Sequence, residues 1–171
     1  MKNAITIAAL CLVLFAFAAT ANAKTDQLSF EMDTGWKIAH SLETKKMKMI
    51  EYVPKGDDIE NWNELFTYQN FGKNYFNHHP EKMLDAIKAL REKECPGVTQ
   101  WTVIAQDQNS ILYEWQAGPC LGNPEQHEIA RIIYGKYNCF FLHYAAKVHE
   151  LSPETRAKWL KLLQAATVHW E

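Results

Sequence analysis

The sequence predicts an α+β domain, an antiparallel sheet of about six to seven strands with two helices packed on it. Strand-like alternation of apolar and polar residues comes first, followed by one helix pattern, four more strands and a second helix pattern. Short turn signals separate the strands, which favours antiparallel neighbours over parallel ones. Each helix pattern carries one apolar stripe, as is typical of helices that cover a sheet.

The strands are expected where this alternation is bounded by turn residues. The patterns lie at residues 28–32, 36–41, 46–53, 62–70, 100–106, 111–117, 127–134 and 138–148. Between the third and the fourth, Pro54 and Gly56 indicate an acidic loop, because Pro presets its φ angle and Gly accepts a positive one. Trp62 opens the strand that follows this loop.

Both helices have recognisable ends. The first is expected to begin at Pro80, with Glu81 near its positive N-terminal end, and to stop before Gly97. The second is expected to be capped by Ser152, with Pro153 at its first position. No internal repeat or linker interrupts these elements, so residues 24–171 are expected to form one domain.

The first 23 residues have the parts of a secretory signal peptide. Lys2 gives a positive start, residues 4–19 are apolar, and Ala21 and Ala23 are the small residues that a signal peptidase reads. The apolar run is shorter than the roughly 20 residues that a bilayer needs. We therefore expect cleavage after Ala23 and a periplasmic or secreted location for the mature chain.

The charge of the mature chain excludes some classes of binding partner. The formal net charge is −2, and removal of the leader with Lys2 makes it more negative. This balance provides no basic face for nucleic acid and no polybasic patch for anionic lipid. No later apolar run is long enough to span a membrane, so membrane insertion of the mature chain is not expected.

Three cysteines follow the leader, Cys95, Cys120 and Cys139. In an oxidising compartment, one disulfide and one remaining thiol is the simplest arrangement. A hairpin that turns at residues 107–110 places Cys95 nearly opposite Cys120 at its open end. We therefore expect a Cys95–Cys120 bridge, worth about 3–4 kcal/mol in the loop-entropy model, and Cys139 as a small buried residue.

The order of elements resembles the PsbP-like fold, in which helices sandwich an antiparallel sheet. Short stretches also resemble an uncharacterised family of secreted bacterial proteins. They are YVPKG at 52–56, NWNE at 61–64, YEW at 113–115 and EIARII at 128–133. The resemblance spans most of the mature chain and implies a non-enzymatic accessory or binding protein, since most members of the PsbP-like class are of that kind.

Familiar catalytic and metal-binding patterns are missing from the sequence. No serine lies in a G-x-S-x-G elbow, no glycine-rich phosphate loop is present, and there is no C-x-x-C pair. Cys139 and His143 share one face of a strand, but four residues of strand separate their backbones by roughly 13 Å, too far for a nucleophile and its base. We expect no cofactor and no metal, although His78 and His79 form an adjacent pair before the first helix.

Charged residues inside strands are the best candidates for a binding site. Glu114 and Arg131 are expected on adjacent strands, either as a cross-strand ion pair or, with His143, as the polar floor of a pocket. Aromatic residues would form the walls. The candidate ligand-binding residues are Trp62, Tyr68, Glu114, Arg131, His143 and Tyr144.

Two kinds of function remain open. The leading hypothesis is a non-enzymatic periplasmic or secreted binding or accessory protein for an unknown small ligand or protein partner, with the loop 54–62 on its recognition surface. The alternative is a small extracytoplasmic hydrolase with an acid–base site around Glu114, Arg131 and His143. A third possibility is a metal carrier that uses His78 and His79.

Overall fold

The computed structural model describes residues 25–72 and 79–170, so the expected leader and His78 lie outside the described residues. The strands are β1 (Asp26–Ser29), β2 (Trp36–Glu43), β3 (Met47–Pro54), β4 (Glu64–Gly72), β5 (Thr99–Gln106), β6 (Ser110–Ala117), β7 (Gln126–Tyr134), β8 (Asn138–Ala146) and β9 (Thr167–Trp170). The helices are α1 (Pro80–Glu94) and α2 (Pro153–Ala165).

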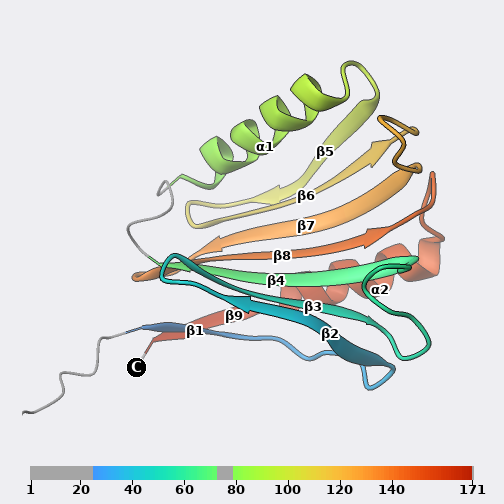
Figure 1. Cartoon of the computed structure of the whole chain (residues 1–171). Helices are drawn as coiled ribbons and strands as arrows, with labels where there is room; N and C mark the ends of the chain where they lie inside the picture. Colours follow the sequence, from blue (N-terminus) through green and yellow to red (C-terminus); the bar gives the residue numbers. More distant parts are fainter. Residues whose placement is uncertain (1–24, 73–78, 171) are drawn as a thin grey trace, which may run out of the picture.

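The fold is an antiparallel sheet of seven strands with two helices, which confirms the predicted α+β class (Figure 1). The strand order is β2-β3-β4-β8-β7-β6-β5. In Figure 1, α2 lies behind the sheet, and α1 lies on the opposite side. Side chains of adjacent strand residues point to opposite faces. Accordingly Ile129 packs in the α2 layer and Ala130 in the α1 layer.

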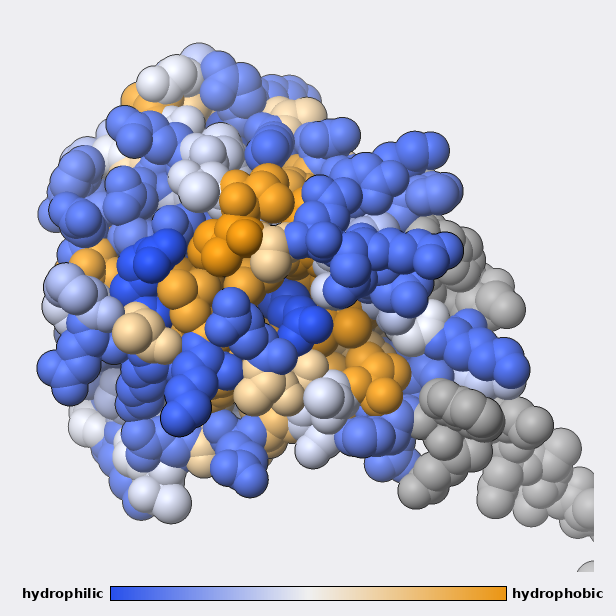
Figure 2. All heavy atoms as spheres, turned by 180° about the vertical axis from the view of Figure 1, so that it is seen from behind, coloured by the Kyte–Doolittle hydropathy of each residue, from blue (hydrophilic) through white to orange (hydrophobic). Residues whose placement is uncertain are grey.

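The α2 layer is built around Trp159, which is almost completely buried. Its ring stacks on Tyr144 at 4.2 Å and on Phe66 at 5.2 Å between centroids. Aromatic pairs at such distances stabilise by about 0.5–1.5 kcal/mol beyond their area burial. Figure 2, seen from behind, looks onto this side and shows apolar side chains gathered at its centre within a hydrophilic surround.

The α1 layer is held by apolar packing and by one disulfide. Leu84 packs with Tyr113 and Trp115, and the guanidinium of Arg91 lies 4.3 Å from the ring centroid of Trp115. The helix begins at Pro80 as predicted, although its preceding residue makes no side-chain cap. These contacts join α1 to the β6–β7 part of the sheet.

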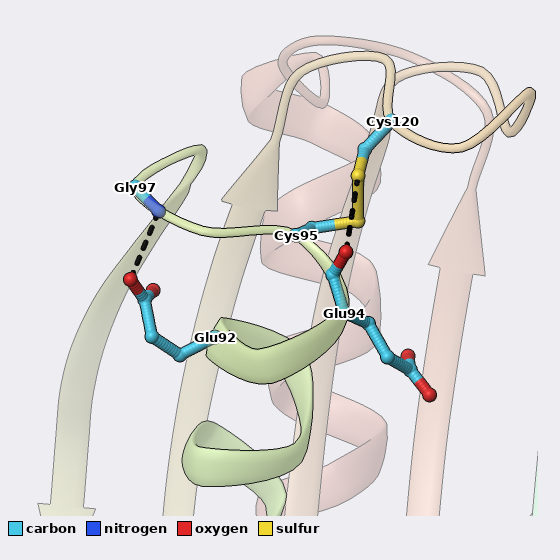
Figure 3. The surroundings of a disulfide bond; sticks show 5 residues. All are labelled: Glu92, Glu94, Cys95, Gly97 and Cys120. Carbon is cyan, nitrogen blue, oxygen red and sulfur yellow. Dashed lines mark hydrogen bonds between the residues drawn. A yellow bond between two sulfur atoms is a disulfide. The ribbon is translucent and has the colours of Figure 1, made fainter.

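The predicted disulfide is confirmed, and it ties the end of α1 to the loop after β6 (Figure 3). Cys95 follows the last residue of α1 and is bonded to Cys120, with their Cα atoms 6.0 Å apart. Gly97 then turns the chain with a φ of 70°, and its N–H donates to the carboxylate of Glu92 at 3.0 Å. Cys139 is a buried free thiol, and burial raises its pKa to about 12.

A second, two-stranded sheet of β1 and β9 was not predicted. The first strand spans residues 26–29, earlier than the expected 28–32, because it pairs with β9 at the other end of the chain. Asp26 fixes this ribbon to the turn between β7 and β8. Asp26 is 3% exposed, and its carboxylate accepts hydrogen bonds from the N–H groups of Tyr137 and Asn138.

Gly135 is needed for this anchor. A Cβ atom at this position would overlap the carboxylate of Asp26, so only glycine allows the acid to approach the turn. The N–H of Asp26 also donates to the side-chain oxygen of Asn138 at 3.2 Å.

We expect Gly135→Ala to lower the free energy of unfolding by about 1–3 kcal/mol, because the added methyl overpacks the anchor. In an Asp26→Ala background the same change should cost much less, because the atom it meets is gone. Urea unfolding of the two single variants and the double variant measures this coupling. Additive costs would contradict the proposed contact.

Candidate functional site

Arg131 holds the C-terminal end of α2. From β7, its Nη1 donates to the carbonyl oxygens of Leu163, Gln164 and Ala166 at 2.7, 3.0 and 3.1 Å. Its Nη2 donates to Oγ of Ser110 at 3.4 Å. The last carbonyls of a helix have no partner within the helix and carry its negative end, so a guanidinium satisfies them well.

Glu114 pairs with α2 and not with Arg131. Its carboxylate accepts hydrogen bonds from Nε and Nη2 of Arg156 at 2.7 and 2.9 Å. In the observed register Glu114 stands opposite Ile129, and Arg131 stands opposite Leu112. The two predicted residues are therefore diagonal neighbours on one face, and the expected ion pair is replaced by one to the first turns of α2.

A buried histidine completes this network. His127 is 1% exposed, and its Nδ1 accepts a hydrogen bond from the backbone N–H of Leu151 at 3.1 Å. The neutral ring therefore carries its proton on Nε2, which lies 3.6 Å from the carboxylate of Glu114. Sequence reasoning missed His127, although Gln116 and Glu114 are polar positions of an otherwise apolar strand near it.

His143 lies on the other face of the sheet, toward α1. It stands opposite Ala130 in β7, next in sequence to Arg131, so the sheet separates it from Arg131 and Glu114. Its Nδ1 is 3.4 Å from the carboxylate of Glu128. The structure thus does not bring together the three residues of the expected polar floor.

The α1 side also holds polar groups that sequence reasoning missed. One row of residues at matching register positions crosses four neighbouring strands, and it consists of Thr67, His143, Ala130 and Tyr113. Within the described part of the chain, Oγ1 of Thr67, Nε2 of His143 and the hydroxyl of Tyr113 are buried without a hydrogen-bond partner. Burial, together with the nearby Glu128, raises the pKa of Tyr113. This row of polar groups can be recognised only when the register of the four strands is known.

The predicted aromatic residues occupy two different places. Tyr68 stacks on Phe30 at 5.8 Å between centroids and belongs to the α2 layer. The hydroxyl of Tyr144 donates to the carboxylate of Glu64 at 2.6 Å, and burial, with this carboxylate, raises the pKa of Tyr144. Trp62 is half-buried. The three rings therefore do not form one wall.

A cavity of about 360 Å³ lies where the ends of β4 and β8 meet the start of α2. Tyr144 lines it, together with Glu64, Lys147, Glu150, Ser152 and Thr155. Trp62 flanks it, since the ammonium group of Lys147 lies 4.3 Å from the centroid of its ring. Of the six predicted residues, Tyr144 thus lines this cavity, and Trp62 contacts Lys147 of its lining.

The polar network around α2 shapes this cavity. Leu151 lines it, and His127 holds the backbone of Leu151. Thr155 lines it one residue before Arg156, which Glu114 holds. A larger cavity of about 450 Å³ lies between β1 and α2, but none of the predicted residues lines it.

Comparisons with known proteins do not assign the chain to a family. No family model and no curated protein matches the chain. Among solved structures it is similar to the human StarD13 (DLC2) lipid transfer and protein localization domain, with 14% identity over 77% of this chain and 84% of that chain, and a TM-score of 0.28. A TM-score of this size is too low to indicate a shared fold.

The described residues contain neither a metal cluster nor a membrane-spanning helix. Over residues 25–72 and 79–170, no group of three His, Cys, Asp or Glu side chains is placed to hold a metal ion. His79 lies just before α1, with its Nδ1 3.5 Å from Glu81. In the same ranges no helix has both the length and the apolar character needed to cross a bilayer.

Protonation of His127 should weaken the fold. Burial lowers its pKa below the usual 6.5, an effect that the nearby Glu114 partly opposes. The unfolded chain therefore binds this proton more readily, and stability that is complete above pH 6.5 is lost as the pH falls below it. Burial tends to raise the pKa of Glu114, but Arg156 and His127 outweigh this and lower it, so Glu114 stays ionised there.

We expect wild type to have a larger free energy of unfolding than His127→Gln, and we expect this difference to shrink as the pH falls from 8 to 5, because glutamine does not titrate. Urea unfolding at each pH measures this difference. His149→Gln, which changes an exposed histidine, is the matched control for the loss of an imidazole and is measured at the same pH values. A pH-independent difference for His127→Gln would contradict the assignment.

Proposed function

We propose that the protein is a non-enzymatic periplasmic or secreted binding protein whose ligand is a small polar molecule held in the cavity at the start of α2. The cavity is the observation that carries this proposal. Its volume of about 360 Å³ falls within the range of small-molecule sites.

The lining favours particular ligands. Glu64 and Glu150 bring two carboxylates, while Lys147 brings one ammonium group that also lies over the ring of Trp62. Ser152 and Thr155 add hydroxyl groups. Such a site suits a ligand rich in hydrogen-bond donors, such as a polyol or an amine, and disfavours an anion, whose charge the carboxylates would repel.

The walls are fixed before any ligand arrives. Arg156 is bound by Glu114, and Leu151 by the buried His127. Preorganised walls reduce the cost of ordering on binding. In the larger cavity beside β1, the ammonium group of Lys158 is already paired with Asp33 at 2.8 Å.

The hydrolytic alternative has less support. Its three residues do not share a site, since His143 lies across the sheet from Glu114 and Arg131. The carboxylate of Glu114 is bound through two nitrogens of Arg156, which stabilises its ionised form and suits it poorly to proton transfer. A binding function needs no such pair.

An extracytoplasmic location is part of the proposal. The Cys95–Cys120 disulfide supports it, because such bonds persist in oxidising compartments. The leader pattern of residues 1–23 supports it independently.

We expect native mass spectrometry of the mature protein, purified from bacterial periplasm, to show a bound small molecule that is lost on denaturation. Val148→Trp should remove it, because Val148 lines the cavity and is exposed enough to accept a larger ring that blocks the entrance. Leu90→Trp, an exposed position on α1, is the matched control and should retain the ligand.

Two results would overturn this site. One is a bare mass for the wild-type protein in periplasmic preparations. The other is an adduct that survives Val148→Trp at the wild-type level, which would place the ligand elsewhere on the chain.

A further inference from the structure

The two edges of the seven-stranded sheet differ in how they are protected. An edge strand exposes unpaired backbone groups, and proteins guard such edges with charged residues, prolines or bulges. The edge strand β2 carries Lys37, His40 and Glu43, and His40 is paired with Glu51 at 2.8 Å. The opposite edge, β5, reads TQWTVIAQ and contains no charged residue.

The backbone of β5 offers a regular row of hydrogen-bonding groups. The N–H of Gly118 donates to the carbonyl of Val98, so the inward-bonded positions are 98, 100 and 102. Thr99, Trp101 and Val103 then turn their N–H and C=O groups away from β6. The bulge of β5 falls after Val103, which leaves the half from Thr99 to Val103 regular.

The side chains along this half are apolar or neutral and accessible. Val98 is 37% exposed and Val103 is 46% exposed. Gln100 and Thr102 are also exposed. An accessible, uncharged edge of this kind is a template for strand addition.

We propose that β5 pairs antiparallel with β5 of a second copy of this chain, around a two-fold axis at Trp101. In this register the outward groups bond reciprocally, with Thr99 opposite Val103 of the second copy and Trp101 opposite its counterpart. The two seven-stranded sheets become one continuous sheet.

Self-pairing fits the chemistry of this edge better than a foreign strand does. A two-fold contact sets the patch against the same patch, so a charge close to Trp101 would meet a like charge of the second copy. The strand itself carries no charge from Thr99 to Gln106. The nearby ammonium group of Lys88 belongs to α1 and lies 5.8 Å from the ring centroid of Trp101. Pairing limited to five residues is a small contact, so we expect a dimer that forms at micromolar or higher concentration.

The test is sedimentation velocity of the oxidised mature protein between about 1 and 500 µM. We expect a monomer–dimer equilibrium, and we expect Val103→Lys to weaken dimerisation by at least about tenfold, because each copy would then carry an ammonium group on the edge strand that must pair. Thr102→Lys, at a second exposed position, should act in the same direction. Ile38→Lys makes the same kind of change on the β2 edge, where the side chain is 60% exposed, and should leave the dissociation constant unchanged.

Circular dichroism of each variant shows whether the monomer stays folded, and the Thr102→Lys result decides the outcome if Val103→Lys unfolds. A monomer at every concentration would overturn the proposal. So would a dimer that Ile38→Lys weakens as much as Val103→Lys does, because that result would remove β5 from the interface.

Discussion

The guanidinium of Arg131 is the contact on which the position of α2 depends. It projects from β7 and donates three hydrogen bonds to carbonyl oxygens at the end of the helix. At the other end Glu114 holds Arg156, and His127 holds the backbone of Leu151. Between these clamps Trp159 stacks on Tyr144 and fills the layer. Polar bonds therefore set where the helix begins and ends, while apolar packing supplies bulk stability.

This arrangement divides the molecule into two sides with different roles. On the α2 side, charged groups of the sheet are used to hold the helix, and the cavity remains beside its first turn. On the α1 side, the helix is tied by apolar contacts and by the Cys95–Cys120 bridge. His143 and Glu128 lie on this second side. A reaction that needs groups from both sides has no common site.

Local signals predicted most of the fold. Pro80, Pro153 and the cap at Ser152 indicate helix starts in the sequence, and the alternation in β6 and β7 is visible without a structure. The disulfide could be predicted because its two cysteines lie at the open end of one hairpin, and the turn of that hairpin is visible in the sequence. The β1–β9 ribbon joins the two ends of the chain, and no local pattern announces such a pairing.

The candidate site was harder to predict because it depends on strand register. A shift of one residue moves a side chain to the other face, and His143 was grouped with Arg131 although the observed register sets Arg131 opposite Leu142. The partners of Glu114 and Arg131 come from α2, whose placement on the sheet follows only from tertiary packing. Tyr144 lines the cavity and Trp62 contacts Lys147 of its lining, and aromatic residues of this size stand out in the sequence whatever the register.

Hydrogen–deuterium exchange of Arg131→Met tests most directly whether the hydrogen bonds at its two ends position α2 on the sheet. Methionine keeps much of the apolar stem but cannot donate to the three carbonyls, a loss worth about 1–3 kcal/mol. We expect amides in the C-terminal half of α2 to exchange about ten- to hundredfold faster, while those of β8 keep their protection. Unchanged protection of α2 would contradict this expectation, because apolar packing alone would then hold the helix.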